Sequence, residues 1–269
     1  MLPRNEKVRR YYDRHVDKEW GRLERHPLEH ATTWRAIEEF IPRPADILDV
    51  GGGPGRYALE LARAGHTVTM ADLSAANVAF AQRKAAERGV RLACLQADAT
   101  NLTEFAASAF DVVLLLGPLY HLVESEERER AVCEAVRVLR DNGVIFAAFI
   151  NRLPFVVDAL AEDPEALAPV DERQLTKRLS DGIRLTEESG DEFPDSYSED
   201  PQAIAPFMEG LGLQTLRVMA VEGLDLLTSP GDLSAEPFER LVDLQFRLGT
   251  DPTMWGSSIH MLYVGRKVA

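Results

Sequence analysis

The sequence has few cysteines, no long apolar run and less positive than negative charge. Its 269 residues include two cysteines, Cys94 and Cys133, which are too few for a disulfide scaffold and do not form a CxxC pair. The longest nearly apolar run, Val112–Leu122, contains His121 and is too short to span a bilayer. No apolar segment of a secretory signal follows the charged first ten residues. These absences predict a cytoplasmic protein that does not cross a membrane.

Positive charge is outnumbered, since 30 Lys and Arg stand against 44 Asp and Glu and give a formal net charge of −14. A strongly acidic surface repels phosphates, so nucleic acid is disfavoured as a partner. Residues 158–200 hold fourteen acidic and four basic residues. Such a run is usually a solvated insertion, and the alternative is a lid that faces a cationic or neutral ligand.

Apolar patterning predicts alternating strands and helices over the first 150 residues. Strands are expected at Asp46–Val50, His66–Ala71, Arg91–Gln96, Phe110–Leu116 and Val144–Ile150. The helices between them are expected at Tyr57–Ala64, Ser74–Arg88 and Glu126–Leu139, with a turn at Asp141–Gly143 before the last strand. Such alternation is typical of a doubly wound, mostly parallel, Rossmann-like α/β sheet.

The flanking regions complete a four-part organisation. Helices are predicted at Arg4–Arg25 and from Pro27 to just before Pro42, and two short helices within Leu153–Gly190. The C-terminal elements are expected to be helix, strand, helix and strand, at Pro201–Leu211, Leu213–Val221, Ala235–Leu248 and His260–Arg266. We therefore expect an N-terminal helical lid (1–45), a core (46–150), an acidic helical insertion that caps the substrate (151–200), and the rest of the sheet with its own helical insertion (201–269).

The segment Ile47–Arg56, ILDVGGGPGR, is the most informative stretch. Glycines between a first strand and its helix let the backbone approach a ligand closely and direct the helix N-terminus toward it. Taken alone the signal is weak, because Gly53–Ala58 also satisfies the loose GxGxxA form of a dinucleotide site.

Acidic residues after the first three strands narrow the choice of ligand. Asp49 ends the first strand, where a carboxylate repels a pyrophosphate but suits an ammonium group. Asp72 ends the second strand and can hold both ribose hydroxyls, although it can also cap a helix. Asp98 can accept from an adenine amine beside the Ala99 N–H, although Asp98–Asn101 also fits a capping turn. An amino-acid end, a ribose and an adenine together indicate S-adenosylmethionine (SAM).

The Ile47–Arg56 segment resembles motif I of the class I SAM-dependent methyltransferases, and the resemblance covers Ile47–Ile150. The segments Tyr11–Leu28, Leu116–Leu122 and Ser257–Lys267 resemble a bacterial subfamily whose substrates are mostly unassigned. The family implies strand order 3-2-1-4-5-7-6, with a reversed last strand and SAM over the ends of strands one to four. The cofactor site predicted on these grounds comprises Asp49, Gly51, Gly53, Asp72, Leu73, Asp98, Ala99, Leu116 and Tyr12.

The acceptor side is less well defined. Gly117–Tyr120 (GPLY) stands where the amino-methylating DNA enzymes of the family carry an Asn/Asp-Pro-Pro-aromatic motif, so a nucleobase amine is disfavoured. His121 follows the fourth strand and is the catalytic base that position suggests, unless it is only a helix-start histidine. Tyr11, Tyr12 and Trp20 either close over SAM or only pack their helix. Predicted substrate contacts are Tyr120, Arg152, Tyr197, Trp255 and His260.

The resulting hypothesis is a SAM-dependent methyltransferase that acts on a small molecule. The alternatives are an NAD(P)-dependent oxidoreductase, a non-catalytic SAM-binding module, and an RNA or protein methyltransferase. No metal is expected, because His26 and His30 have helical spacing but lack a third ligand, and no GxSxG motif is present. The sequence leaves open the acceptor, the atom that is methylated and the oligomeric state.

Overall fold

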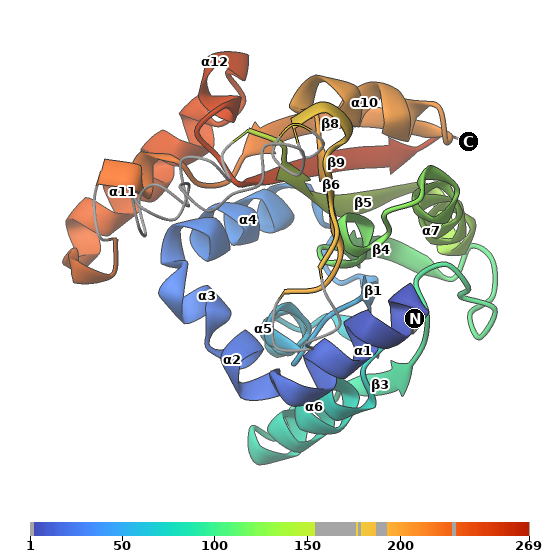
Figure 1. The fold of residues 1–269 in the computed structure, drawn as a ribbon. Coiled ribbons are helices and arrows are strands. Elements are labelled where there is room, and N and C mark those ends of the chain that lie inside the picture. Colours follow the sequence, from blue (N-terminus) through green and yellow to red (C-terminus); the bar gives the residue numbers. More distant parts are fainter. Residues whose placement is uncertain (1–2, 154–175, 177–178, 187–192, 228–229, 269) are drawn as a thin grey trace.

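The computed structural model describes residues 3–153, 176, 179–186, 193–227 and 230–268. Its centre is a sheet in which β3 (Ala93–Gln96), β2 (Thr67–Asp72), β1 (Asp46–Val50), β4 (Phe110–Leu115) and β5 (Leu139–Asn151) run parallel in that order. The sheet continues from β5 to β9 (His260–Lys267), which is antiparallel, and from β9 to β8 (Leu213–Ala220). The predicted Rossmann-like class, strand order and reversed last strand are confirmed (Figure 1).

Helices cover both faces of the sheet because buried side chains alternate along its central strands. One buried cluster joins one face to α7 (Ser125–Val138) and α10 (Pro201–Glu209). The other joins the opposite face to α4 (Pro27–Phe40), α5 (Arg56–Arg63) and α6 (Ala75–Glu87). The remaining C-terminal helices are α11 (Ala235–Leu248) and α12 (Pro252–Trp255), with short 3-10 turns at Pro118–His121, Leu224–Leu227 and Pro230–Asp232.

The predicted N-terminal helix over Arg4–Arg25 is wrong as a single element. The chain instead forms α1 (Arg4–Arg14), α2 (Val16–Trp20) and α3 (Arg22–Arg25), with breaks at His15 and Gly21. His15 leaves helical geometry, and its Nδ1 lies 2.8 Å from the carbonyl oxygen of Tyr11, which ties the ring to the end of α1. Because of these breaks, the segment from α1 to α4 follows an arc instead of a straight line (Figure 1).

Strand β5 begins earlier than predicted. It starts at Leu139 and includes the predicted Asp141–Gly143 turn as an irregularity, since its register with β4 shifts between Phe110 and Val112. Asn142 adopts a left-handed φ of 64°, which asparagine tolerates better than most residues. The turn chemistry was recognised, but it interrupts the strand locally rather than preceding it.

Most of the expected helical region Leu153–Gly190 lies outside the described residues. The described parts of the acidic segment include two short strands, β6 (Ile183–Arg184) and β7 (Ser196–Glu199), which pair with each other. Strand β7 also runs parallel to the end of β5, at Ile150 and Asn151. No helix among the described residues is long and apolar enough to cross a membrane.

Candidate functional site

The glycine loop after β1 takes backbone conformations that depend on glycine. Gly51, Gly53 and Gly55 have φ values of 68°, 58° and 88°, in the left-handed region. A Cβ on Gly51 would lie 2.5 Å from the Pro118 side chain, whereas a Cβ on Gly53 would meet no atom within 4 Å. Gly53 therefore presents bare backbone to an open space.

That open space is a cavity of about 230 Å³ at the carboxyl edge of β1, β2 and β4, here called the main cavity. It brings together all nine predicted cofactor residues: Asp49, Gly51, Gly53, Asp72, Leu73, Asp98, Ala99, Leu116 and Tyr12. Tyr120 and His121 also line it. Because parallel strands end at the same edge, residues from Asp49 to His121 share this wall, and Tyr12 of α1 joins them from the N-terminal segment.

Asp49 is the most unusual group in the main cavity. Its side chain is 2% exposed, and its Oδ2 atom has no hydrogen-bond partner among the described residues. Burial and the neighbouring carboxylate of Asp72 raise the pKa of Asp49 to about 7. A buried carboxylate without a partner is costly, so this atom calls for a cationic or donor group.

Asp72 organises the loop as well as lining the cavity. One of its oxygens accepts from the Gly53 N–H at 2.8 Å, and the other accepts from the Ser74 N–H at 2.8 Å and Asn77 Nδ2 at 3.2 Å. Burial raises its pKa above the usual range. The N-cap of α6 is Ser74, so Asp72 is not the helix cap that the sequence left as an alternative.

Asp98 fits both interpretations that the sequence left open. Its Oδ1 accepts from the backbone N–H of Thr100 at 2.9 Å and from the Thr100 hydroxyl at 2.8 Å, which closes the capping turn. The residue nevertheless lines the main cavity. The turn fixes the carboxylate at the cavity wall, since a carboxylate has lone pairs beyond those the turn uses.

Tyr12 and His121 meet at the wall of the main cavity, although they are 109 positions apart. The Tyr12 hydroxyl lies 2.7 Å from Nε2 of His121. Burial lowers the pKa of His121 to about 4, and its ring packs against Tyr120 and Phe193. These contacts favour a role for His121 in holding α1 against the loop after β4 over its predicted role as a base.

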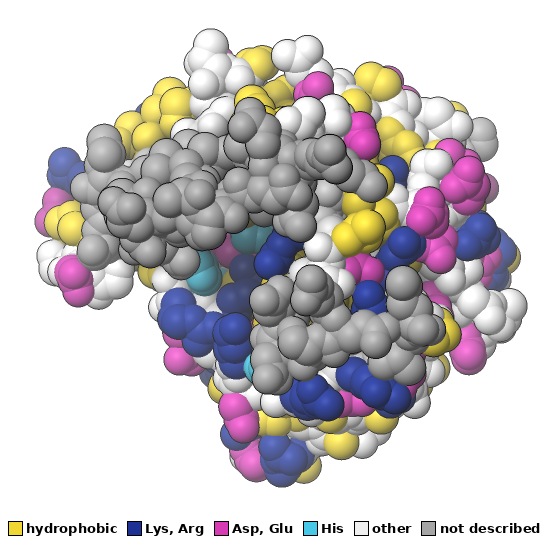
Figure 2. Space-filling model, in the orientation of Figure 1, with side chains coloured by type: hydrophobic (Ala, Val, Ile, Leu, Met, Phe, Trp, Pro, Cys, Tyr) yellow, Lys and Arg dark blue, Asp and Glu magenta, His cyan; other side chains and the backbone are white. Residues whose placement is uncertain are grey.

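Basic side chains gather around the central hollow on the face shown in Figure 2, in spite of the acidic composition. Those lining the main cavity are Arg4, Arg22 and Arg56. Each is paired: Arg4 with Glu124 at 3.0 Å, Arg22 with Glu29 at 2.7 Å and Arg56 with Glu24 at 2.9 Å. The arginines thus balance acidic neighbours and do not by themselves form an anion site.

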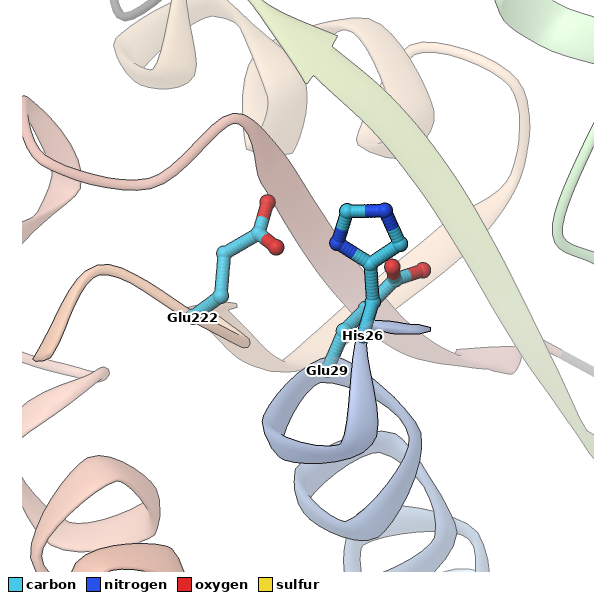
Figure 3. A group of neighbouring side chains, drawn as sticks. All are labelled: His26, Glu29 and Glu222. Carbon is cyan, nitrogen blue, oxygen red and sulfur yellow. The ribbon is translucent and has the colours of Figure 1, made fainter. Parts of the chain in front are cut away.

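A second group of charged side chains lies beside the main cavity, around His26, Glu29 and Glu222 (Figure 3). Their potential ligand atoms lie within 4.8 Å of one another. However, Arg22 donates to both oxygens of Glu29, at 2.7 and 2.8 Å, and His260 Nδ1 lies 2.8 Å from Glu222. Since Arg22 neutralises Glu29 and the His260 ring occupies Glu222, we assign these residues to a network of ion pairs and hydrogen bonds rather than to a metal site.

Three predicted substrate contacts lie away from both cavities. Arg152 donates to the Ser180 carbonyl at 2.8 Å, and Trp255 donates to the Gly249 carbonyl at 2.9 Å. The Tyr197 ring lies 3.5 Å from the Arg128 guanidinium. His260, in contrast, lines a small cavity next to the main one.

Several residues that line the main cavity and the small cavity were not predicted from the sequence. Arg22, Tyr57 and Leu116 line both cavities, and of these only Leu116 was predicted. Glu29 and Glu222 are 6% and 5% exposed, which is rare for glutamate. The one local signal was a glutamate in the buried first turn of α4, and helical periodicity alone does not distinguish it from a solvated residue.

Comparison with known proteins agrees with this geometry. Residues 47–143 match the family model described as a methyltransferase domain. This segment of the chain is similar to methyltransferase domains. The matched residues span β1 to the irregular start of β5, so they include the glycine loop and all three carboxylates of the main cavity.

The similar proteins match different shares of this chain. A ubiquinone biosynthesis O-methyltransferase of Caulobacter vibrioides is 34% identical over 106 residues, which cover 39% of this chain and 41% of that protein. The chain therefore spans less than half the length of this curated relative. The crystal structure of a Burkholderia thailandensis 1,6-didemethyltoxoflavin-N1-methyltransferase matches with TM-score 0.60 and 16% identity, over 100% of this chain and 92% of that one. The magnesium protoporphyrin IX methyltransferase of Synechocystis matches with TM-score 0.59 and 15% identity, over 98% and 100%.

Proposed function

We propose that this protein transfers a methyl group from SAM to a small-molecule acceptor. The observation that carries the proposal is the buried, unpartnered Oδ2 of Asp49 beside the glycine loop, in one cavity with Asp72 and Asp98. A ligand with an ammonium group, a ribose and an adenine satisfies all three carboxylates.

Each part of the ligand contacts a different residue of the main cavity. Asp49 accepts from the ammonium group, Asp72 holds the ribose hydroxyls with the lone pairs it has left, and Asp98 receives the adenine amine beside Ala99. Gly53 leaves room for the ligand because it has no side chain. When bound, SAM supplies an electrophilic methyl group on a sulfonium centre. The protein aligns the acceptor with it and excludes water, with Tyr12 closing the mouth.

The oxidoreductase alternative is weaker on electrostatic grounds. A dinucleotide would place its pyrophosphate against the glycine loop, where Asp49 and Asp72 both stand within the same wall. The buried Asp49 carboxylate repels that group and attracts a cationic ligand, whereas Asp72 suits the ribose of either cofactor. The non-catalytic alternative keeps the same cofactor site and differs only in whether methyl transfer follows binding.

A small acceptor is supported by chemistry and by similarity. The net charge of −14 disfavours a polyanionic acceptor such as RNA. Two of the similar proteins, a ubiquinone biosynthesis O-methyltransferase and 1,6-didemethyltoxoflavin-N1-methyltransferase, are named for small molecules.

The proposal is tested by calorimetric titration of SAM and NAD into wild type and Gly53→Val. We expect SAM to bind wild type and not the variant, because the valine side chain would fill the space that the ligand needs. Gly89→Val is the matched control: Gly89 has a φ of 63° against 58° for Gly53, and its Cβ would also meet no atom within 4 Å. Both variants carry similar backbone strain, but Gly89 does not line the main cavity.

Catalysis is tested with labelled SAM and a metabolite extract, followed by mass spectrometry of the labelled product. A labelled small molecule formed by wild type and not by Gly53→Val supports the proposal. Binding of NAD in place of SAM would overturn it, and binding of SAM without any labelled product would favour the non-catalytic alternative.

A further inference from the structure

The ion-pair network around His260 lies at the edge of the sheet that also carries the main cavity. His260 begins β9, which is antiparallel, and it pairs with Ile150 near the end of β5. Glu222 follows the end of β8, and Glu29 lies in the first turn of α4. Three elements from distant parts of the sequence thus bring buried charges to the β5–β9–β8 half of this edge. The three carboxylates of the main cavity lie at the other half, at or just after the ends of β1, β2 and β3.

Glu222 fixes the His260 ring. The same carboxylate oxygen, Oε1, accepts from the His260 backbone N–H at 2.9 Å and lies 2.8 Å from ring Nδ1. A proton on Nδ1 that is donated to a carboxylate selects the tautomer in which Nε2 carries the lone pair. A second carboxylate, Glu29, lies 3.8 Å from the same Nδ1. The ring is therefore held in one orientation and is ready to accept a proton at Nε2.

A small cavity beside this histidine shares part of its lining with the main cavity. Its volume of about 20 Å³ has room for one water molecule. His260 lines it together with Arg22, Tyr57 and Leu116, and these three residues also line the main cavity. His260 therefore stands behind the wall that these three residues form for the main cavity, and a proton released by an acceptor seated at that wall would reach the ring through the small cavity.

From this arrangement we propose that His260, oriented by Glu222, is the base that takes the proton from the acceptor, and that the acceptor is a small molecule with a hydroxyl nucleophile. The inference rests on the proposed function, since it needs a methyl donor in the main cavity. A hydroxyl keeps its proton at neutral pH, so its methylation requires a base, whereas a neutral amine or a thioether does not.

The charged groups around His260 make it a stronger base. Glu29 and Glu222 raise the pKa of His260 above its usual value, although burial and the Arg22 guanidinium act in the opposite direction. His26 and Asp225 also face this network, His26 beside Glu29 and Asp225 beside Glu222. His121, by comparison, has its Nε2 engaged by the Tyr12 hydroxyl and a pKa lowered to about 4. Of the two histidines, His260 is the better proton acceptor.

The step balances as follows. The hydroxyl oxygen forms a bond to the methyl carbon, and the carbon–sulfur bond breaks with its electron pair remaining on sulfur. The hydroxyl proton moves to Nε2 of His260, and the charge of the resulting imidazolium is stabilised by Glu222 and Glu29. Release of that proton to solvent restores the neutral ring.

The first test requires no acceptor. NMR titration of the histidine rings, assigned with His260→Gln and His121→Gln, should give His260 a higher midpoint than His121. Glu222→Gln should move the His260 midpoint to lower pH and leave that of His121 in place. A His260 midpoint that does not move in Glu222→Gln, or that lies below the midpoint of His121, would overturn the proposal that Glu222 orients His260 as a base.

The second test uses the acceptor found with labelled SAM. His260→Gln should lower kcat by roughly 10²–10⁴-fold with SAM affinity unchanged. The acid limb of the wild-type kcat profile should shift to lower pH in Glu222→Gln. His66→Gln is the matched control, because this buried histidine stands just before β2, at the opposite edge of the sheet, and lines neither cavity.

The atom that carries the methyl group in the product identifies the class of acceptor. An O-methyl product is expected, and an N-, C- or S-methyl product would overturn the hydroxyl assignment. Full activity in His260→Gln would show that His260 is not the base. Failure of the proposed function looks different, since wild type itself would then fail to bind SAM or to form any methylated product.

Discussion

Asp49 makes the stability of the fold depend on pH through a single carboxyl group. With its pKa raised to about 7, the folded protein holds a proton there that the unfolded chain releases near pH 4. The stabilising contribution is therefore fully present below about pH 4 and is lost as pH rises toward 7. Asp72 and Cys94 face the same group, and burial raises both of their pKa values too.

We predict that Asp49→Asn removes much of this pH dependence. In urea unfolding between pH 5 and 7, the free energy of unfolding of wild type should fall by up to about 1.4 kcal/mol per pH unit relative to that of the variant. Parallel curves for the two proteins would contradict the assignment of the raised pKa to Asp49. At pH 8 the variant should be the more stable protein, since the uncompensated charge is then absent.

Asp72 organises the glycine loop, and this structural role can be separated from its proposed role in binding SAM. Asp72→Ala leaves three donors, on Gly53, Ser74 and Asn77, without their acceptor. We expect a loss of roughly 1–3 kcal/mol in unfolding free energy and a loss of similar size in SAM binding. Asn77→Ala removes one of these contacts away from the cavity, so it should lower stability and leave calorimetric SAM affinity unchanged. Equal losses of affinity in both variants would show that Asp72 acts through the loop alone.

At the scale of elements, α1 is joined to the loop after β4 by the Tyr12–His121 contact. Ion pairs of Arg4 with Glu124 and of Lys7 with Asp195 add to it, at 3.0 and 3.5 Å. The first links α1 to the start of α7, and the second links it to the segment just before β7. The helix is thus held over the cavity mouth by contacts that are individually weak.

Tyr12→Phe should loosen this cover. Loss of one buried hydrogen bond corresponds to about 1 kcal/mol, so we expect roughly fivefold faster SAM release and faster amide exchange over residues 4–14. Tyr11→Phe is the matched control, because Tyr11 packs through its ring on Tyr12, His15 and Phe193. Stopped-flow release and hydrogen exchange measure the two effects. If the two variants release SAM at the same rate, the Tyr12 hydroxyl does not hold the lid.

At the scale of the whole molecule, acidic composition does not translate into a metal requirement. Glu29 and Glu222 are the acids whose geometry comes nearest to a metal site within the described residues, and Glu29 is paired with Arg22 while Glu222 contacts the His260 ring. Methyl transfer and SAM affinity should therefore survive dialysis against EDTA. Activity that is lost on chelation and restored by Mg²⁺ would show that these carboxylates bind an ion despite their partners.

The sequence by itself determined the sheet and the cofactor half of the site. Buried parallel strands such as Phe110–Leu115 appear as continuous apolar runs, and the acids that follow them stand at fixed positions relative to the strand ends. Asp49, the glycine loop and Asp72 lie within 24 consecutive residues, so local order was enough to bring them together. The break of the first helix at His15 was not predicted because the helical spacing of apolar residues continues across it, from Tyr12 to Val16.

Only the tertiary structure decided the other half of the site. Arg22, Glu29, Glu222 and His260 come from the two ends of the chain, and of these only His260 was predicted as a site residue, as a substrate contact. Their meeting depends on β9 running antiparallel to β5 and on α4 packing beside it, which no periodicity encodes. The pairing of Tyr12 with His121 has the same origin. Local patterns fix which residues point inward, but the packing of distant elements selects which inward-pointing charges become partners.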